Sequence, residues 1–291
     1  MRVHVVSDVH GNTDALARAG DGADALVVLG DLIDFVDYHD HSRGILGRIF
    51  GAEVVRRFAE LRSGGPGDLV AFVRGLWDQL DDPVGVIEHE VREQYRRIFA
   101  SLPAPTYATP GNVDLPHLWA EFAGDGVTVC DGSHAVIGDV RFGFVGGALL
   151  PGPQPTLPTL PPFLPLPLPG REEPGHGQAA APPRRRRGPW MPYMRTPAEY
   201  AAAVNALATD RVDVLASHIP PAVPDLCYDV VARHPERGSA CLLEFIRTRR
   251  PALALFGHVH APLARRTRVG RTECVNVGHF QRSETPYVLR W

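Results

Sequence analysis

Five short polar motifs carry the residues of this 291-residue chain that could do chemistry. The motifs are SDVHG (7–11), GDLID (30–34), GNVD (111–114), SHIPP (217–221) and GHVH (257–260). Their carboxylates, imidazoles and amide oxygen, without any thiolate, suit one or two hard to borderline divalent ions such as Mn, Fe or Zn. The candidate ligands are Asp8, His10, Asp31, Asn112, His218, His258 and His260.

Four of the motifs, taken alone, also have a purely structural interpretation. The first could be a helix cap beside a surface imidazole, and the second a pair of aspartates bonded to their own turns. The fourth could be a hydrogen-bonded loop histidine. His258 and His260 stand one residue apart on a segment that we expect to be extended, so their side chains would point to the same side. That arrangement suits a metal site and also an exposed strand.

The motifs are tied together by the elements that precede them. Each comes at or just past the end of a short apolar run, at 3–7, 25–30, 106–109, 212–217 and 252–257. Between the first runs lies a helical pattern, and this alternation predicts an α/β fold. Ligands of open α/β sheets bind beyond the carboxyl ends of the strands. We therefore expect the five motifs to converge on one crevice.

Further patterns complete the predicted domain, a single one over 1–291. Apolar residues at helical spacing over 44–63, 67–80 and 83–101 predict a helical insertion at 44–101. Residues 151–192 hold 14 of the 28 prolines and an Arg run, which predicts a flexible Pro/Arg-rich loop. Other predicted elements are a helix at 197–208 and strands at 127–130, 135–138, 140–147, 263–269, 272–277 and 287–291.

Composition narrows the partners of the protein. The formal charge of −3 gives no general attraction to polyanions, so we expect no nucleic-acid partner. No run of 18 apolar residues and no leader pattern occur, so we expect no membrane partner and a cytoplasmic location. The four cysteines lack disulfide or zinc spacing, which fits a reducing compartment. The oligomeric state stays open.

The ordered motifs D-x-H, G-D-x-x-D, G-N, a lone His and G-H-x-H resemble those of the calcineurin-like metallophosphoesterases. The resemblance implies a four-layer αββα sandwich with a dinuclear metal centre between two sheets. It also implies that a hydroxide bridging two divalent ions hydrolyses a small phosphoester, as in a phosphodiesterase or phosphatase. Mn is the ion that we expect to support activity in vitro.

The resemblance assigns each ligand by position. Asp8, His10 and His260 would hold the first ion, and Asn112, His218 and His258 the second. Asp31 would bridge the two ions. Within this set the expected catalytic residues are Asp31, Asn112 and His218. Two neighbouring aspartates would support these residues. Asp34 would orient a ligand or stabilise the local structure, and Asp114 would stabilise its loop.

Val113 departs from the family pattern. Many members continue G-N-H-[DE], and that His is thought to contact phosphate and to help protonate the leaving group. A subset has an apolar residue or Cys there, and it includes phosphodiesterases acting on model diesters and a non-catalytic scaffold lineage. A scaffold is therefore one alternative function, although retention of all seven ligands favours an enzyme. A nuclease is the other, supported only by the Arg runs at 184–187 and 265–271.

Other polar residues could compensate for the missing His. His39 or His41 could supply the acid and Arg43 a phosphate contact, since all three closely follow the second motif. The alternative is a solvated loop leading to the helical insertion. His279, in a loop after the last motif, is a further candidate for the acid.

Overall fold

The computed structural model describes residues 1–64, 66–150, 190 and 192–291. The predicted Pro/Arg-rich loop at 151–192 lies outside these ranges except for Trp190 and Pro192. The described helices include none that is both long and apolar enough to cross a membrane. All four cysteines are buried and free.

The first sheet is mostly parallel and has the strand order β15-β1-β2-β3-β4. Its inner strands are short, rich in Val, Leu and Ala, and mostly buried, as strands covered on both faces are. The antiparallel edge strand β15 pairs with β1. The strands are β1 (Arg2–Val6), β2 (Ala25–Val28), β3 (Thr106–Ala108), β4 (Val127–Val129) and β15 (Tyr287–Arg290).

The second sheet has the order β13-β14-β12-β9-β6-β5. Its four inner strands are parallel, and an antiparallel strand lies at each edge. The strands are β5 (Ser133–Ile137), β6 (Val140–Val145), β9 (Val214–Ser217), β12 (Leu253–Phe256), β13 (Arg266–Val269) and β14 (Thr272–Asn276).

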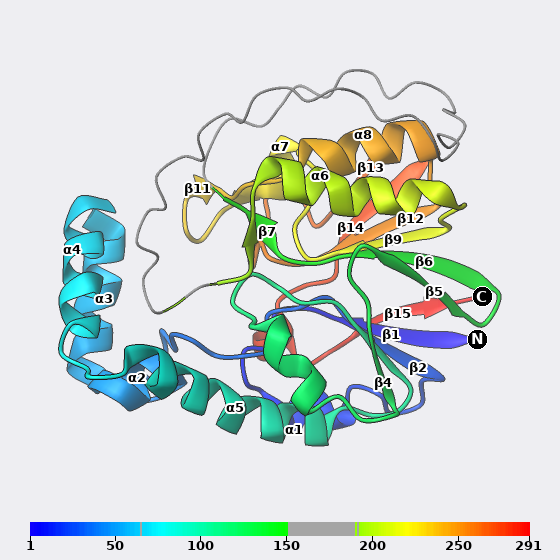
Figure 1. Cartoon of the computed structure of the whole chain (residues 1–291). Coiled ribbons are helices and arrows are strands. Elements are labelled where there is room, and N and C mark those ends of the chain that lie inside the picture. The colour runs from blue at the N-terminus through cyan, green and yellow to red at the C-terminus, as the bar shows by residue number, and fades with distance from the viewer. Residues whose placement is uncertain (65, 151–189, 191) are drawn as a thin grey trace, which may run out of the picture.

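The two sheets pack face to face, and helices cover both outer faces (Figure 1). The core between the sheets contains Val5, Leu29, Phe144 and Leu255, all completely buried. Helices α1 (Thr13–Arg18) and α5 (Pro83–Ser101) cover the first sheet, and α6 (Pro197–Ala206) and α8 (Ala240–Arg249) the second. This arrangement confirms the predicted α/β sandwich.

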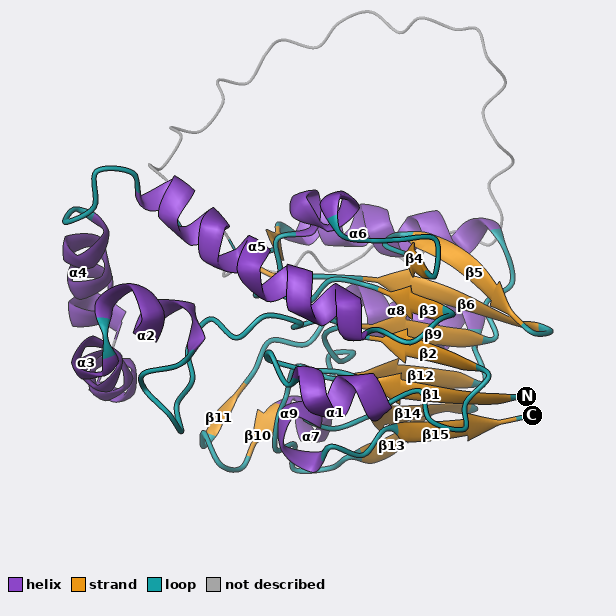
Figure 2. Cartoon of the chain, turned by 90° about the horizontal axis from the view of Figure 1, so that it is seen from below, coloured by secondary structure: helices purple, strands orange, loops and turns teal. Residues whose placement is uncertain are grey.

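The described residues of the segment 44–101, all but residue 65, form four helices. They are α2 (Gly44–Phe50), α3 (Ala52–Gly64), α4 (Pro66–Trp77) and α5. The helical spacing over 44–63 is shared by two helices, because Gly51 takes φ 85° and separates α2 from α3. Helices α2, α3 and α4 lie at one end of the molecule, beyond the sheets (Figures 1 and 2). The division into one domain with an insertion stays a prediction.

Several short elements connect the layers. The predicted helix at 197–208 ends at Ala206 and continues as a single 3₁₀ turn. The other short elements are η1 (Pro116–Glu121), β7 (Ala148–Leu149), β8 (Met194–Arg195), η2 (Leu207–Thr209), α7 (Pro224–Cys227), β10 (Tyr228–Asp229), β11 (His234–Pro235) and α9 (Phe280–Ser283).

Candidate metal centre

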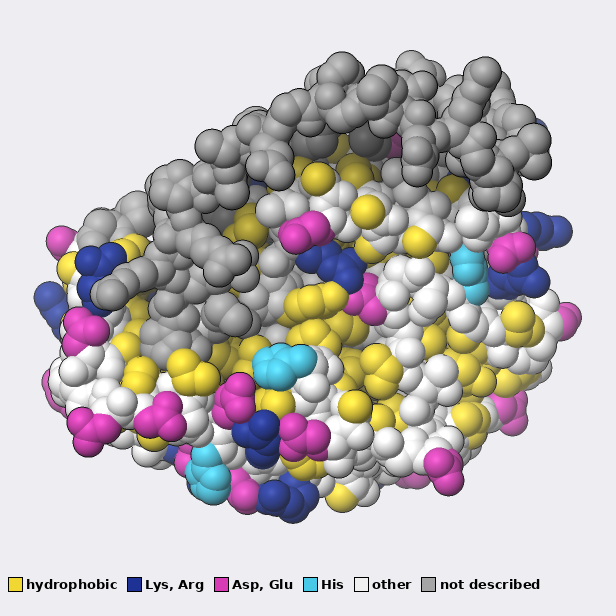
Figure 3. Space-filling model, in the orientation of Figure 1, with side chains coloured by type: hydrophobic (Ala, Val, Ile, Leu, Met, Phe, Trp, Pro, Cys, Tyr) yellow, Lys and Arg dark blue, Asp and Glu magenta, His cyan; other side chains and the backbone are white. Residues whose placement is uncertain are grey.

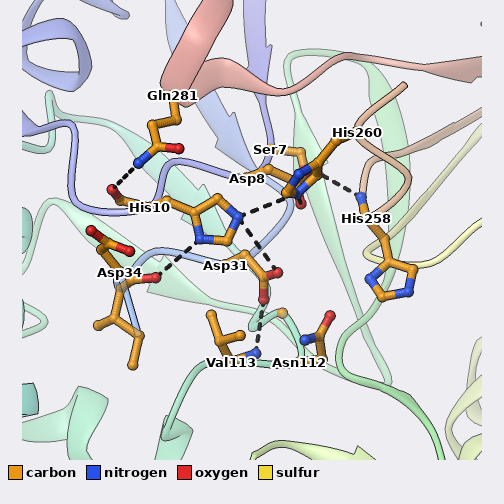
Figure 4. A network of polar contacts seen from close by, with 12 residues as sticks. Ser7, Asp8, His10, Asp31, Asp34, Asn112, Val113, His258, His260 and Gln281 are labelled. Carbon is orange, nitrogen blue, oxygen red and sulfur yellow. Dashed lines mark hydrogen bonds and ion pairs between the residues drawn. The ribbon is translucent and has the colours of Figure 1, made fainter. Parts of the chain in front are cut away.

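The loops that follow the parallel strands of both sheets meet at one place. β1, β2 and β3 supply it from the first sheet, and β9 and β12 from the second. Figure 4 shows the side chains of Asp8, His10, Asp31, Asn112 and His260 close together. The residues brought together are Asp8, His10, Asp31, Asn112, His218, His258 and His260.

Glycines let these loops touch. A Cβ atom on Gly111 would lie 2.2 Å from the backbone nitrogen of Asp31, and one on Gly30 would lie 2.1 Å from the nitrogen of Gly111. At the contact between the sheets, a Cβ atom on Gly257 would lie 1.9 Å from Ser7 Oγ and 2.3 Å from Asp8 Oδ2. Only residues without a side chain permit this approach of backbone to ligand.

Four of the candidate ligands have left-handed backbone conformations. Their φ angles are 57° at Asp8, 42° at His10, 52° at Asp31 and 67° at His258. Side-chain-bearing residues adopt this region rarely and at an energetic cost, and such residues gather at functional sites. The expected extended segment through His258 and His260 is therefore wrong. The ring of His258 faces His218 at 5.1 Å between centroids, whereas that of His260 faces His10 at 5.2 Å.

The first group of ligands surrounds His260. Its Nε2 lies 3.3 Å from Asp8 Oδ1 and 3.3 Å from His10 Nε2. The Nε2 of His10 is in turn 4.0 Å from Asp31 Oδ2. The second oxygen of Asp8 accepts the backbone N–H of His258 at 2.9 Å, which fixes the carboxylate and leaves Oδ1 facing the imidazoles.

The second group surrounds His218. Its Nε2 lies 2.9 Å from Asn112 Oδ1 and 3.5 Å from Asp31 Oδ2. Asp31 Oδ1 accepts the backbone N–H of Val113 at 2.9 Å. The other oxygen of Asp31, Oδ2, therefore stands between the two groups, within 4.0 Å of an imidazole nitrogen from each.

The orientation of His218 shows that the site fits a cation. Its Nδ1 lies 2.8 Å from the carbonyl oxygen of Leu29, so we assign the hydrogen to Nδ1. The Nε2 lone pair of a neutral His218 would then face oxygen lone pairs of Asn112 and Asp31, which is repulsive unless a proton or a metal ion lies between. Burial opposes protonation, but Asp31 outweighs it and raises the pKa of His218 to about 9. A divalent ion would satisfy the same three atoms.

Both carboxylates and His258 are in the forms that ligands need at neutral pH, whereas at His260 the effect of burial is outweighed by Asp8, which raises the pKa of that imidazole. Burial alone would raise the pKa of Asp31, but the imidazoles of His218 and His10 hold it at about 2. The pKa of Asp8 is likewise held far below its usual range, mainly by His260 against the effect of burial. Burial and the nearby His218 lower the pKa of His258 to about 4, so its ring is neutral. Anionic carboxylates and neutral imidazoles bind divalent ions.

The sequence profile of the calcineurin-like phosphoesterases matches residues 1–262. This chain belongs to the calcineurin-like phosphoesterase family. The resemblance seen in the sequence is thereby confirmed. Membership implies metal-dependent hydrolysis of phosphoesters, and the Asp and His groups described above could hold metal ions.

Solved structures resemble this calcineurin-like phosphoesterase in fold. One crystal structure is similar over 96% of this chain and 91% of its own, with 17% identity and a TM-score of 0.55. The crystal structure of TT1561 of Thermus thermophilus is similar over 99% of this chain and 98% of its own, with 13% identity and a TM-score of 0.49. The comparison with curated protein sequences gave no match.

The two supporting aspartates of this phosphoesterase lie in different surroundings. Asp114 accepts the backbone N–H groups of Gly111 and Leu32 at 2.8 and 3.0 Å, so it joins the second and third motifs. Burial and the charge of Asp31 raise its pKa to about 7. Asp34 lies in the wall of a cavity beside His10. Its burial and, to a lesser extent, the charge of Asp37 raise its pKa to about 7.

Of the three residues proposed to contact substrate after the second motif, Arg43 is the best placed. It lines two cavities beside His10, of about 350 and 470 Å³. His39 lines only the larger one, and His41 is in the lining of neither. His279 is in the lining of neither cavity, and its ring stacks on His260 at 3.8 Å between centroids.

Sequence reasoning missed the residues that hold these loops together. Asn276, at the end of β14, donates to the carbonyls of Gly257 and Val259 at 3.2 and 2.9 Å, and so fixes the GHVH loop. Glu236 lies 3.8 Å from His258 Nε2. No motif marks either residue, although an Asn at the end of a buried strand was a usable signal, because a buried amide needs partners.

Proposed function

We propose that this protein hydrolyses a small phosphoester, as a phosphodiesterase or phosphatase, with two divalent ions held by the seven candidate ligands. The observation that carries the proposal is the position of Asp31 Oδ2 between the two groups of imidazoles. Asp8, His10 and His260 would hold one ion, Asn112, His218 and His258 the other, and Asp31 both. Mn²⁺ is the preferred ion for activity, with Fe and Zn as alternatives suited to the same nitrogen and oxygen ligands.

The ions would supply the hydrolytic chemistry. Two bound divalent ions lower the pKa of a water between them and neutralise charge that develops on the phosphoryl oxygens. The protein's part is to hold the ligands rigidly: Leu29 fixes His218 through its carbonyl, Ile33 fixes His10 in the same way, and the Val113 amide fixes Asp31. Ligands fixed by such bonds keep their donor atoms aimed at the ions.

The cavities beside His10 support a small substrate with an additional anionic or polar group. Arg43 is exposed and lines both cavities, so its guanidinium can reach an anion bound there. On the face seen in Figure 3, arginines are interspersed with acidic side chains, and its described part shows no broad basic surface. The net charge of −3 and this surface favour a small molecule over a nucleic acid.

The test is a panel of phosphomonoesters and phosphodiesters offered to the Mn²⁺-loaded protein. We expect turnover that stops on chelation. Asp31→Asn should lower kcat/KM at least about 100-fold, since changing even an outer partner of a ligand costs 10- to 100-fold. Asp125→Asn, at an exposed position, is the matched control and should leave kcat/KM unchanged. Failure of the wild type to bind ions after reconstitution, or full activity of Asp31→Asn, would contradict the proposal.

The contact of Arg43 with substrate has its own test. Arg43→Ala should raise KM for esters that carry a second anionic group and leave kcat nearly unchanged, because the residue lies in the cavity wall rather than among the ligands. Equal KM values for the variant and the wild type on such esters would contradict this role.

A further inference from the structure

His279 lies against the first group of ligands. Its ring stacks on that of His260, with 3.8 Å between centroids and 17° between planes, and meets His10 edge-on at 5.6 Å. One nitrogen from each of His10, His260 and His279 falls within 4.8 Å of the other two. Three imidazoles therefore gather at a place where the five motifs supply only two.

The Nε2 atom of His279 is buried and has no hydrogen-bond partner in the part of the chain that the structure describes. Buried polar side-chain atoms nearly always have a partner, and one without it calls for an explanation such as an ion. Coordination of a metal ion would supply the missing partner.

The backbone holds His279 in place from both sides. The next two residues, Phe280 and Gln281, donate their N–H groups to the carbonyls of Ser7 and Asp8 at 2.9 and 3.0 Å. The Gln281 side chain also donates to the carbonyl of His10 at 3.0 Å, as Figure 4 shows. Phe280 is buried in the core beneath, so the backbone that carries the imidazole is fixed relative to Asp8 and His10.

Asn276 completes this support from the second sheet. Its side-chain oxygen accepts the N–H of Gly278, while its amide group donates to the loop that carries His258 and His260. Gly278 takes φ 104°, which turns the chain sharply before His279. The side chain of Asn276 thus fixes the GHVH loop relative to the backbone next to His279.

We propose that His279 is a further ligand of the ion held by Asp8, His10 and His260. This inference rests on the proposed function, because it presumes that an ion binds there. Three imidazoles with carboxylate oxygens remain a donor set suited to Mn, Fe or Zn. A ring nitrogen binds a metal ion in the plane of its ring, so the stacked rings of His260 and His279 cannot both bind one ion as they lie, and the proposal requires the His279 ring to turn from this position. The rival explanation is that the ring only packs on His260 and touches no ion.

The substitution His279→Phe separates these explanations, because it keeps a ring for stacking and removes the nitrogens. Mn²⁺ binding is measured by the EPR signal of the free ion, without substrate. The wild type should bind about two ions. In His279→Phe one of them should bind about 10- to 100-fold more weakly and the other unchanged. His89→Phe, at an exposed imidazole on α5 that belongs to none of the five motifs, is the matched control and should bind as the wild type does.

Each outcome of the titration decides a different point. Two ions bound with wild-type affinity by His279→Phe would overturn the role of His279 and leave the proposed function standing. A wild type that binds no ion would overturn the proposed function itself. A second experiment uses crystals of the wild type soaked with Zn²⁺, so it does not depend on the folding of a variant. We expect anomalous density at a ligand distance of about 2.0–2.1 Å from His279, and density on Asp8, His10 and His260 alone would overturn the inference.

Discussion

Val113 stands where the G-N-H-[DE] pattern of the family has a histidine. This position therefore supplies no acid for the leaving group. Its backbone N–H bonds to Asp31, so the residue still supports the proposed bridging ligand. Its side chain is partly buried against the apolar core that includes residues of α1 and α5. An isopropyl group cannot transfer a proton, so departure of a poor leaving group depends on another acid or on water.

Val113→His should therefore raise turnover of alkyl phosphoesters more than that of nitrophenyl esters. An alkoxide needs a proton to leave and a nitrophenolate does not, and general acid catalysis contributes about 10²- to 10⁴-fold. The measurement is the ratio of kcat on the two ester types for variant and wild type. If the wild type already cleaves alkyl esters well and the variant gains nothing, another residue is the acid. His39 is then the next position to change, because it lines the larger cavity together with Arg43.

Residue types and spacing predicted which side chains come together better than they predicted the geometry of those side chains. Asp8, Asp31 and His218 could be named from motifs because each follows a strand of buried residues. The left-handed backbone at His258 could not, because it depends on the bond from its N–H to Asp8 across 250 residues of sequence. A pattern of neighbours along the chain holds no information about such a contact.

At the scale of elements, the site depends on loops that touch through glycine. The strands that end at these loops were predictable from their Val, Leu and Ala runs, and so was the convergence of their carboxyl ends. The break between α2 and α3 was missed because the apolar pattern runs on through Gly51. The hairpin of β10 and β11 was missed because two-residue strands have no periodicity to detect.

Gly257→Ala tests the contact between the two sheets. The added methyl group would lie 1.9 Å from Ser7 Oγ and 2.3 Å from Asp8 Oδ2, so the GHVH loop or Asp8 must move. We expect Mn²⁺ affinity to fall at least about tenfold, measured by titration, because displaced ligands bind weakly. Gly124→Ala, where nothing lies within 4 Å of the new atom, is the control. Wild-type affinity in Gly257→Ala would show that the loop relaxes without disturbing the ligands.

At the scale of the whole molecule, the candidate ligands come from both sheets. Asp8, Asp31 and Asn112 follow strands of the first sheet, and His218 and His258 follow strands of the second. The sheets also share an apolar core, which burial stabilises. Ions bound between the loops would join the two sheets at one edge, so metal binding and folding should be linked.

Mn²⁺ should therefore raise the melting temperature of the metal-free protein. At a free ion concentration of 1,000 times Kd, binding to one site stabilises the folded state by about 4 kcal/mol. That corresponds to a rise of roughly 8 to 16 °C, at about 2 to 4 °C per kcal/mol for a protein approaching this size. The measurement is calorimetry of the chelator-treated protein with and without Mn²⁺. Because Asp31 lies between both groups of ligands, Asp31→Asn should lose most of the rise, whereas Asp125→Asn should keep it. An equal rise in all three proteins would mean that the ion binds elsewhere than between the sheets.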